Sequence, residues 1–237
     1  MPRFFIPPVS GDIVTLTGED AAHISRSLRM RPGEVITLSD GASTDYEAEL
    51  IETGSEVTAR ILSRFPCKAE PQAKITLFQA MPKGDKMEFI IQKATELGVS
   101  VIQPVLTSRC VSRPDDKSMK KKLERYQKIA REAAGQSGRG IIPEVLPLVT
   151  LAQAAQRLPA KTIFFYEKGG ARLASIITPE DKEIGMIIGS EGGFSQEEAD
   201  FLAEKGAYTA TLGARILRCE TAPIAGLSVI LSLTGDI

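Results

Sequence analysis

The apolar residues of the chain follow two different patterns of spacing. Over residues 1 to about 66 they form short runs, separated by turn sequences such as Arg31-Pro32-Gly33-Glu34 and Asp40-Gly41-Ala42-Ser43. Such runs predict short strands, with one helical insert at 19–28. We expect the strands at 3–6, 12–16, 35–39, 46–51 and 57–65. Short strands joined by regular turns favour a small β-barrel.

From residue 72 onward, strand-like runs alternate with helical patterns, which is typical of a parallel α/β sheet. The predicted strands are 74–79, 101–106, 162–166, 184–188 and 208–212. Helices are predicted at 85–97 and 119–134, from 196 onward, and at 223–233. A proline-bounded linker, 65–71, separates the two patterns. We therefore predict a β-barrel domain over 1–68 and an α/β domain over 72–237.

Two strand-to-helix turns of the α/β part are rich in glycine, 188–195 and 212–223. In an open parallel sheet, such turns line a crevice at the carboxyl ends of neighbouring strands, where ligands bind. For a single glycine turn, packing alone is the favoured interpretation. Two turns so close together, the second carrying Arg215, Arg218 and Glu220, favour a binding site.

The composition of the chain limits which binding partners and which kinds of site are possible. The chain has 237 residues, of which 43% are hydrophobic, so it can bury a core. The net charge is −1, so any surface for nucleic acid must be local. Three scattered cysteines and no C-x-x-C predict thiols in a reducing compartment, with no zinc site. With no apolar run long enough for a membrane, we expect a cytoplasmic protein.

Familiar catalytic motifs are absent from the sequence. There is no phosphate-binding loop, no dinucleotide fingerprint and no nucleophile elbow, and the single histidine, His23, lies in the first domain. Catalysis would therefore use carboxylates, arginines, backbone amides and a bound cofactor. Lys83–Glu88 and the helix that follows are expected to shape the site. Glu132, Gln136 and Arg139 would share a helical stripe if the helix persisted past Gly135. Because 136–140 is a poor helix continuation, we expect these groups on a loop, where sites are often built.

The residues of the two glycine turns carry a family resemblance. Gly189-Ser190-Glu191-Gly192-Gly193 and Leu212-Gly213-Ala214-Arg215-Ile216-Leu217-Arg218-Cys219-Glu220-Thr221 resemble the SPOUT-class RNA methyltransferases. The closest resemblance is to the bacterial 16S rRNA uridine-N3 methyltransferases, the RsmE family. Ser190 and Ala214 stand where that family usually has proline. The resemblance implies a parallel α/β sheet with a C-terminal trefoil knot, a PUA-like RNA-binding domain before it, and a homodimer.

The resemblance also implies S-adenosylmethionine as the cofactor, held by the backbone of the two turns. Its expected binding residues are Tyr166, Ile188, Gly189, Glu191, Gly192, Gly193, Leu212, Gly213, Ile216, Leu217 and Arg218. We expect a carboxylate to accept the proton of uracil N3, and an arginine to stabilise the resulting charge. The candidate bases are Glu132 and Glu220, and the candidate arginines are Arg109, Arg139 and Arg218.

Basic residues of the first domain could form a patch that contacts RNA phosphates. On charge alone, an ordinary solvent-exposed face is an equally good interpretation. The resemblance favours RNA. The expected RNA-binding residues are Arg3, His23, Arg26, Arg29 and Arg31. For His23, a hydrogen bond to a local carbonyl is an equal alternative to a base contact.

The expected function is methylation of N3 of a uridine in 16S rRNA, free or within the small ribosomal subunit, without a metal. Two alternatives stay open. One is a methyltransferase of another RNA, such as tRNA, or of another base. The other is a non-catalytic ribosome-assembly factor that binds RNA and no cofactor. The apolar stripe of the last helix, Ile224, Leu227, Ile230 and Leu231, suits a dimer interface or burial within its own domain equally well.

Overall fold

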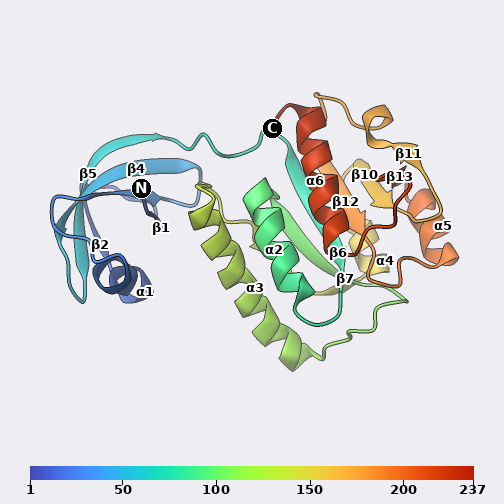
Figure 1. Ribbon diagram of the computed structural model, residues 1–237, viewed down its shortest axis with the longest axis horizontal. Coiled ribbons are helices and arrows are strands. Elements are labelled where there is room, and N and C mark those ends of the chain that lie inside the picture. The colour runs from blue at the N-terminus through green and yellow to red at the C-terminus, as the bar shows by residue number, and fades with distance from the viewer. The chain divides into compact units, whose positions relative to one another are not determined.

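The computed structural model describes residues 1–237, which form two compact units (Figure 1). The first unit comprises Met1–Glu70 and Ala134–Ile142, and the second comprises Pro71–Ala133 and Pro143–Ile237. The chain leaves the first unit within the predicted linker and returns to it once. The return segment, 134–142, was not foreseen, because its nine residues carry no periodic pattern.

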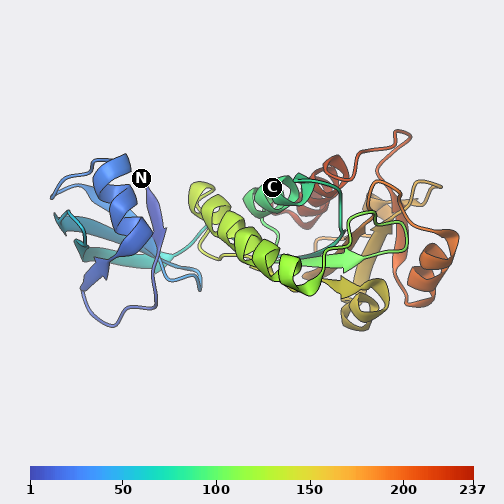
Figure 2. The ribbon, with the colours of Figure 1, turned by 90° about the horizontal axis from the view of Figure 1, so that it is seen from below.

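The first unit is built on a five-stranded mixed sheet with a helical insert. The strands are β1 (Arg3–Phe5), β2 (Ile13–Leu16), β3 (Val35–Ser39), β4 (Thr44–Glu52) and β5 (Val57–Pro66). Their order is β1-β3-β4-β5-β2, in which only β1 and β3 are parallel. The insert consists of α1 (Gly18–Ala22) and the π-helical turn η1 (His23–Ser27). It covers the sheet (Figure 2), and its Ala21 and Ile24 are fully buried in the core.

A parallel sheet forms the centre of the second unit, as the alternating pattern predicted. Its main strands are β6 (Lys74–Ala80), β7 (Val101–Leu106), β8 (Glu144–Val145), β10 (Lys161–Phe165), β11 (Ala171–Arg172), β12 (Glu183–Ile188) and β13 (Tyr208–Thr211). The order is β11-β13-β10-β12-β6-β7-β8, and β9 (Val149–Thr150) also pairs with β7. The central strands are apolar along their length because helices cover both faces.

The helices of the second unit lie on both sides of this sheet (Figure 2). They are α2 (Lys86–Leu97), α3 (Asp116–Gln136), α4 (Leu151–Ala154), α5 (Gln196–Glu204) and α6 (Thr221–Thr234), with 3-10 turns η2 (Ala155–Arg157) and η3 (Leu173–Ser175). α2 and α6 pack together, whereas α4 and α5 share a core with Phe78, Phe164 and Ile187 on the other face. No helix is long and apolar enough to cross a membrane.

Two sequence expectations about helices can be compared with this structure. α3 does continue past Gly135, but it ends at Gln136, so Arg139 lies beyond it. In α6, Leu227, Ile230 and Leu231 are fully buried within the second unit, which is the packing role considered for that stripe. The short elements β8, β9, β11 and α4 were not predicted, because two to four residues are too few to show a period. The trefoil knot stays a prediction.

Candidate functional site

A pocket of about 560 Å³ opens in the second unit where β10, β12 and β13 end. These three strands are neighbours and parallel, so their carboxyl ends meet at one edge of the sheet. The walls are the residues that follow each strand, 165–167, 188–193 and 210–219. This is the position at which open α/β sheets bind ligands, and the volume suits a small organic molecule.

The turn after β12 brings bare backbone to the pocket. Gly193 has a φ of +63°, a left-handed conformation that disfavours a side chain, and its N–H donates to the carbonyl of Ser190 at 2.9 Å. A Cβ on Gly193 would lie 2.9 Å from a carboxylate oxygen of Glu167, and one on Gly189 would lie 3.1 Å from the Gly193 Cα. The turn therefore favours glycine at both positions, and its backbone lies directly at the pocket wall.

The turn after β13 supplies an apolar rim. Gly213 has a φ of +107°, and its N–H donates to Thr211 Oγ1 at 3.1 Å. Ile216 lines the pocket although 84% of its surface is exposed, so an apolar group is held where water reaches it. The turn ends where the N–H groups of Thr221 and Ala222 donate to the carbonyl of Arg218, both at 2.9 Å, and start α6. An exposed isoleucine at this place offers a contact surface for an apolar part of a ligand.

Lys86, in the first turn of α2, joins the two turns of the pocket. Its Nζ lies 2.9 Å from Glu191 Oε1 and 3.3 Å from Glu220 Oε2, and it approaches the thiol of Cys219 at 3.8 Å. The backbone N–H of Lys83 donates to the same Glu191 oxygen at 3.1 Å. One ammonium group therefore bridges a carboxylate on each turn. The sequence placed Lys86 in a segment expected to shape the site, but gave it no binding or catalytic role. The only signal was the polar segment 83–88 at the start of the helix.

This cluster changes the acidity of its members. Burial alone would raise the pKa of Glu191, but the hydrogen bonds from Lys86 and from the Lys83 N–H lower it overall. The pKa of Glu220 is likewise lowered, because its backbone hydrogen bond and Lys86 outweigh burial. Burial and the neighbouring Glu220 raise the pKa of the Cys219 thiol to about 12. At neutral pH the cluster thus contains two carboxylates, one ammonium and a neutral thiol.

Two buried polar atoms at this edge of the sheet have no hydrogen-bond partner, Ser190 Oγ and Gln79 Oε1. Ser190 lines the pocket and follows β12 directly, and Gln79 belongs to the neighbouring β6. Native proteins rarely leave buried polar atoms unpaired, so such atoms point to a missing partner. The pocket thus combines apolar walls, glycine backbone and an unsatisfied hydroxyl, which fits a ligand that is both apolar and polar.

The structure brings every expected cofactor residue into the wall of this pocket. Of the expected catalytic residues, Arg218 lines it, and Glu220 adjoins it through Lys86. Arg109 stands beside the first turn, where its Nη1 donates to the carbonyl of Gly192 at 2.9 Å. Their roles in binding and catalysis stay predictions.

Glu132 and Arg139 are not in this wall. Glu132 is exposed on α3 in the second unit. Arg139 belongs to the first unit and is only 3% exposed, with Nη2 2.7 Å from Glu70 Oε2. Glu70 also accepts from the N–H groups of Gly140 at 2.9 Å and Ile141 at 3.0 Å. This carboxylate holds the return segment against the first unit, so Arg139 has a structural contact.

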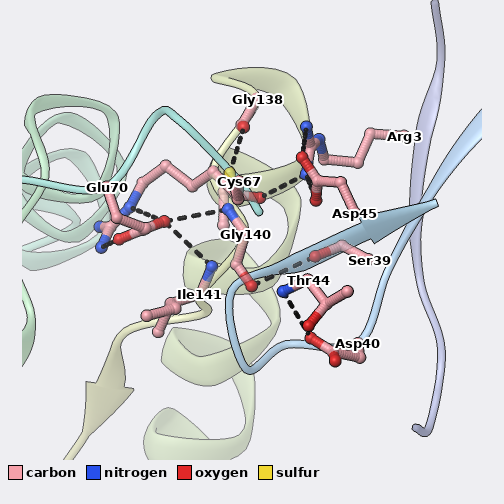
Figure 3. Close-up of polar contacts among 12 residues, drawn as sticks. Arg3, Ser39, Asp40, Thr44, Asp45, Cys67, Glu70, Gly138, Gly140 and Ile141 are labelled. Carbon is pink, nitrogen blue, oxygen red and sulfur yellow. Dashed lines mark hydrogen bonds and ion pairs between the residues drawn. The ribbon is translucent and has the colours of Figure 1, made fainter. Parts of the chain in front are cut away.

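Of the expected RNA-binding residues, one is engaged in an ion pair and four are exposed to solvent. Arg3 forms a two-pronged pair with the buried Asp45, at 2.5 and 2.8 Å (Figure 3), which occupies its guanidinium. The side chains of His23, Arg26, Arg29 and Arg31 are exposed. The His23 ring lies edge-on to Phe4, with centroids 6.0 Å apart. The helical insert and the turn after it therefore present one histidine and three arginines to solvent.

Comparison with known proteins places the chain in a family. A family model described as an RNA methyltransferase domain matches residues 68–231, and one described as an RNA methyltransferase PUA domain matches residues 16–62. Ribosomal RNA small subunit methyltransferase E of Bacillus subtilis is 34% identical over 97% of this chain and 96% of its own length. The protein of the same name from Synechocystis is 33% identical over 93% of this chain and 73% of its own length.

A solved structure agrees with these sequence matches. Ribosomal RNA small subunit methyltransferase E from Neisseria gonorrhoeae, crystallised with S-adenosylmethionine, superposes with a TM-score of 0.91. The two chains are 36% identical, and the match covers 98% of each. Both domains and the whole length of the chain are accounted for by one kind of protein. The chain belongs to the ribosomal RNA small subunit methyltransferase E family.

Proposed function

We propose that this protein transfers a methyl group from S-adenosylmethionine to N3 of a uridine in 16S rRNA. The observation that carries the proposal is the pocket between the two glycine turns, in a chain 36% identical to a relative crystallised with this cofactor. The name of the Bacillus subtilis relative, ribosomal RNA small subunit methyltransferase E, gives the RNA of the small subunit as the substrate of that protein.

The residues of the pocket suit S-adenosylmethionine. The cofactor supplies the methyl group on its sulfonium. The backbone N–H of Gly192 can hydrogen-bond a nucleoside or a carboxylate without any charged side chain, and Ile188 and Leu217 provide apolar walls. Ser190 Oγ is an unpaired group at the same wall. The protein would contribute mainly by holding the two reactants in line, which lowers the entropic cost of the transfer.

The proton of uracil N3 must leave during the reaction. Of the two carboxylates considered, Glu220 adjoins the pocket, whereas Glu132 lies on the exposed face of α3. The pKa of Glu220 is lowered, because hydrogen bonds to its backbone, Cys219 and Lys86 outweigh burial, so its carboxylate is ionised at neutral pH. The same lowering makes it a weaker base, so its place beside the pocket is what supports the role. We assign it that role. Arg218 in the pocket wall would stabilise the negative charge that spreads onto the uracil oxygens.

The family resemblance also suggests where the RNA binds, in which compartment the protein acts and how many chains assemble. The exposed arginines Arg26, Arg29 and Arg31 of the first unit would contact RNA phosphates. We place the activity in the cytoplasm, on 16S rRNA free or within the small subunit, and we expect a homodimer. Light scattering of the purified protein tests the homodimer.

The decisive experiment supplies the purified protein with S-adenosylmethionine carrying an isotopically labelled methyl group. Small ribosomal subunits, free 16S rRNA and tRNA serve as substrates, and the nucleosides are identified by mass spectrometry after digestion. Labelled 3-methyluridine from the small-subunit RNA is the expected product. Label in another nucleoside or only in tRNA would favour a methyltransferase of another RNA. RNA binding without calorimetric binding of the cofactor would favour an assembly factor.

A matched pair of variants tests the base. Glu220→Gln should lower turnover while leaving the dissociation constant for S-adenosylmethionine close to that of the wild type. Glu132→Gln, which changes an exposed carboxylate outside the pocket, should leave turnover unchanged. The opposite pattern would move the role of base to Glu132.

A further inference from the structure

Helix α3 carries far more positive charge than the rest of the protein. Its 21 residues include seven lysines and arginines and three acidic residues, a net charge of +4, whereas the whole chain carries −1. The excess is concentrated near the beginning of the helix. Five cations and one carboxylate lie within 117–125. α3 is thus a strongly basic helix in a chain with no overall positive field.

The cations lie on the side of α3 that faces solvent. Met119, Tyr126 and Ala130 are buried, at spacings of seven and four that define one face of the helix. Lys117, Lys121, Arg125 and Lys128 are exposed, at spacings of four, four and three, and form a row on another face. We call this row, with the neighbouring exposed Lys120, the basic stripe. From Lys117 to Lys128 it is about 16 Å long, at about 1.5 Å per residue.

The arrangement is unfavourable for an isolated helix. Asp115 and Asp116 complement the helix dipole at its start, but Lys117, Lys120 and Lys121 follow within the first two turns and oppose it. Like charges four residues apart, such as Lys117 and Lys121, also repel each other. Glu124, exposed on the same face, offsets only part of this charge. An anionic partner along the stripe removes both penalties.

The basic stripe is connected to the pocket through α2. Arg125 Nη2 lies 2.6 Å from Glu88 Oε2, and Glu88 stands in the first turn of α2, two residues after the pocket-lining Lys86. Figures 1 and 2 both show α3 running beside α2. A strand of RNA bound along the stripe would therefore pass the turn that carries a wall of the pocket.

We propose that the basic stripe of α3 binds the sugar–phosphate backbone of the RNA that flanks the target nucleotide. The proposal rests on the proposed function and adds an RNA contact within the second unit. Lysine acts on phosphate as a flexible point charge, so the contact is independent of sequence and serves to position the RNA. Binding of this kind releases counterions and is weakened by salt.

The test compares two triple variants with the same loss of charge. The first is Lys117→Gln, Lys120→Gln, Lys121→Gln, and the control is Lys74→Gln, Lys182→Gln, Lys205→Gln, three exposed lysines of the second unit outside α3. Glutamine preserves helix propensity. Affinity for a fragment of 16S rRNA is measured at about 50 to 200 mM KCl. The slope of log K against log salt should become shallower by about 2–3 in the first variant, at roughly 0.7–0.9 per lost phosphate contact.

The control should keep the wild-type slope, and replacement of the same three α3 lysines by arginine should retain it as well. Equal losses in the test and control variants would reduce the effect to net charge and overturn the proposal. So would an unchanged slope in the test variant, or binding of α3 to phosphatidylserine vesicles in preference to RNA. Calorimetric binding of S-adenosylmethionine and formation of 3-methyluridine by the wild type test the proposed function separately.

Discussion

Replacing Gly193 by alanine tests the cofactor site through the backbone alone. The substitution adds one methyl group and no charge, at a residue whose φ is +63°. The new Cβ would lie 2.9 Å from a carboxylate oxygen of Glu167. That side chain can move, so the larger cost is the left-handed conformation, which disfavours alanine by about 1–2 kcal/mol.

This cost sets the size of the expected effect. If the turn relaxes to a conformation that does not bind S-adenosylmethionine, about 1–2 kcal/mol reduces the competent population by a factor of about 5–30. The dissociation constant for S-adenosylmethionine should rise by the same factor. The bulkier Gly193→Val should abolish binding, because its branched side chain also crowds Glu167.

Isothermal titration calorimetry provides the measurement, and Gly206→Ala provides the control. Gly206 has a φ of +84°, follows α5 and lies outside the pocket, and a Cβ added to it would meet no atom within 4 Å. The Gly206→Ala variant should lose stability and keep its affinity for the cofactor. An unchanged affinity in Gly193→Ala, or an equal loss in both variants, would refute a cofactor site at this turn.

Three further predictions concern the polar clusters. Glu70→Ala should destabilise the first unit by about 3–5 kcal/mol in calorimetric unfolding, because it leaves the buried Arg139 without this carboxylate; an effect under about 1 kcal/mol would contradict this. Lys86→Met should weaken S-adenosylmethionine binding in calorimetry, because Glu191 and Glu220 then repel across the pocket, whereas Lys86→Arg should retain most of the affinity. The pKa values of Glu191 and Glu220 are lower in the folded protein than in the unfolded chain, so the unfolded chain binds more protons in acid. The stability that these carboxylates contribute is therefore complete above their ordinary pKa of 4.5 and is lost as the pH falls below it. The difference in melting temperature between wild type and Lys86→Met should accordingly shrink below pH 4.5, and a constant difference would exclude this linkage.

Local patterns were sufficient to predict the architecture. Runs with periods of two and of 3.6 residues distinguished the sheet of the first unit from the alternating strands and helices of the second. Because carboxyl ends of parallel strands meet at one edge, the glycine turns after β12 and β13 could be expected to meet in space. The pocket and its glycine-rich wall were thus accessible from sequence, helped by the family resemblance.

Local periodicity and the glycine turns were therefore enough to predict the kind of fold and the edge of the sheet where the pocket lies. The return of 134–142 to the first unit depends on tertiary contacts. Tertiary structure alone decided which charged residues are engaged. Arg139 pairs with Glu70, 69 residues away, and Lys86 with Glu191, 105 residues away. An arginine in solvent and one in a buried ion pair look the same in a sequence. Only the folded chain determines the partner, because burial and ion pairing depend on segments that are distant along it.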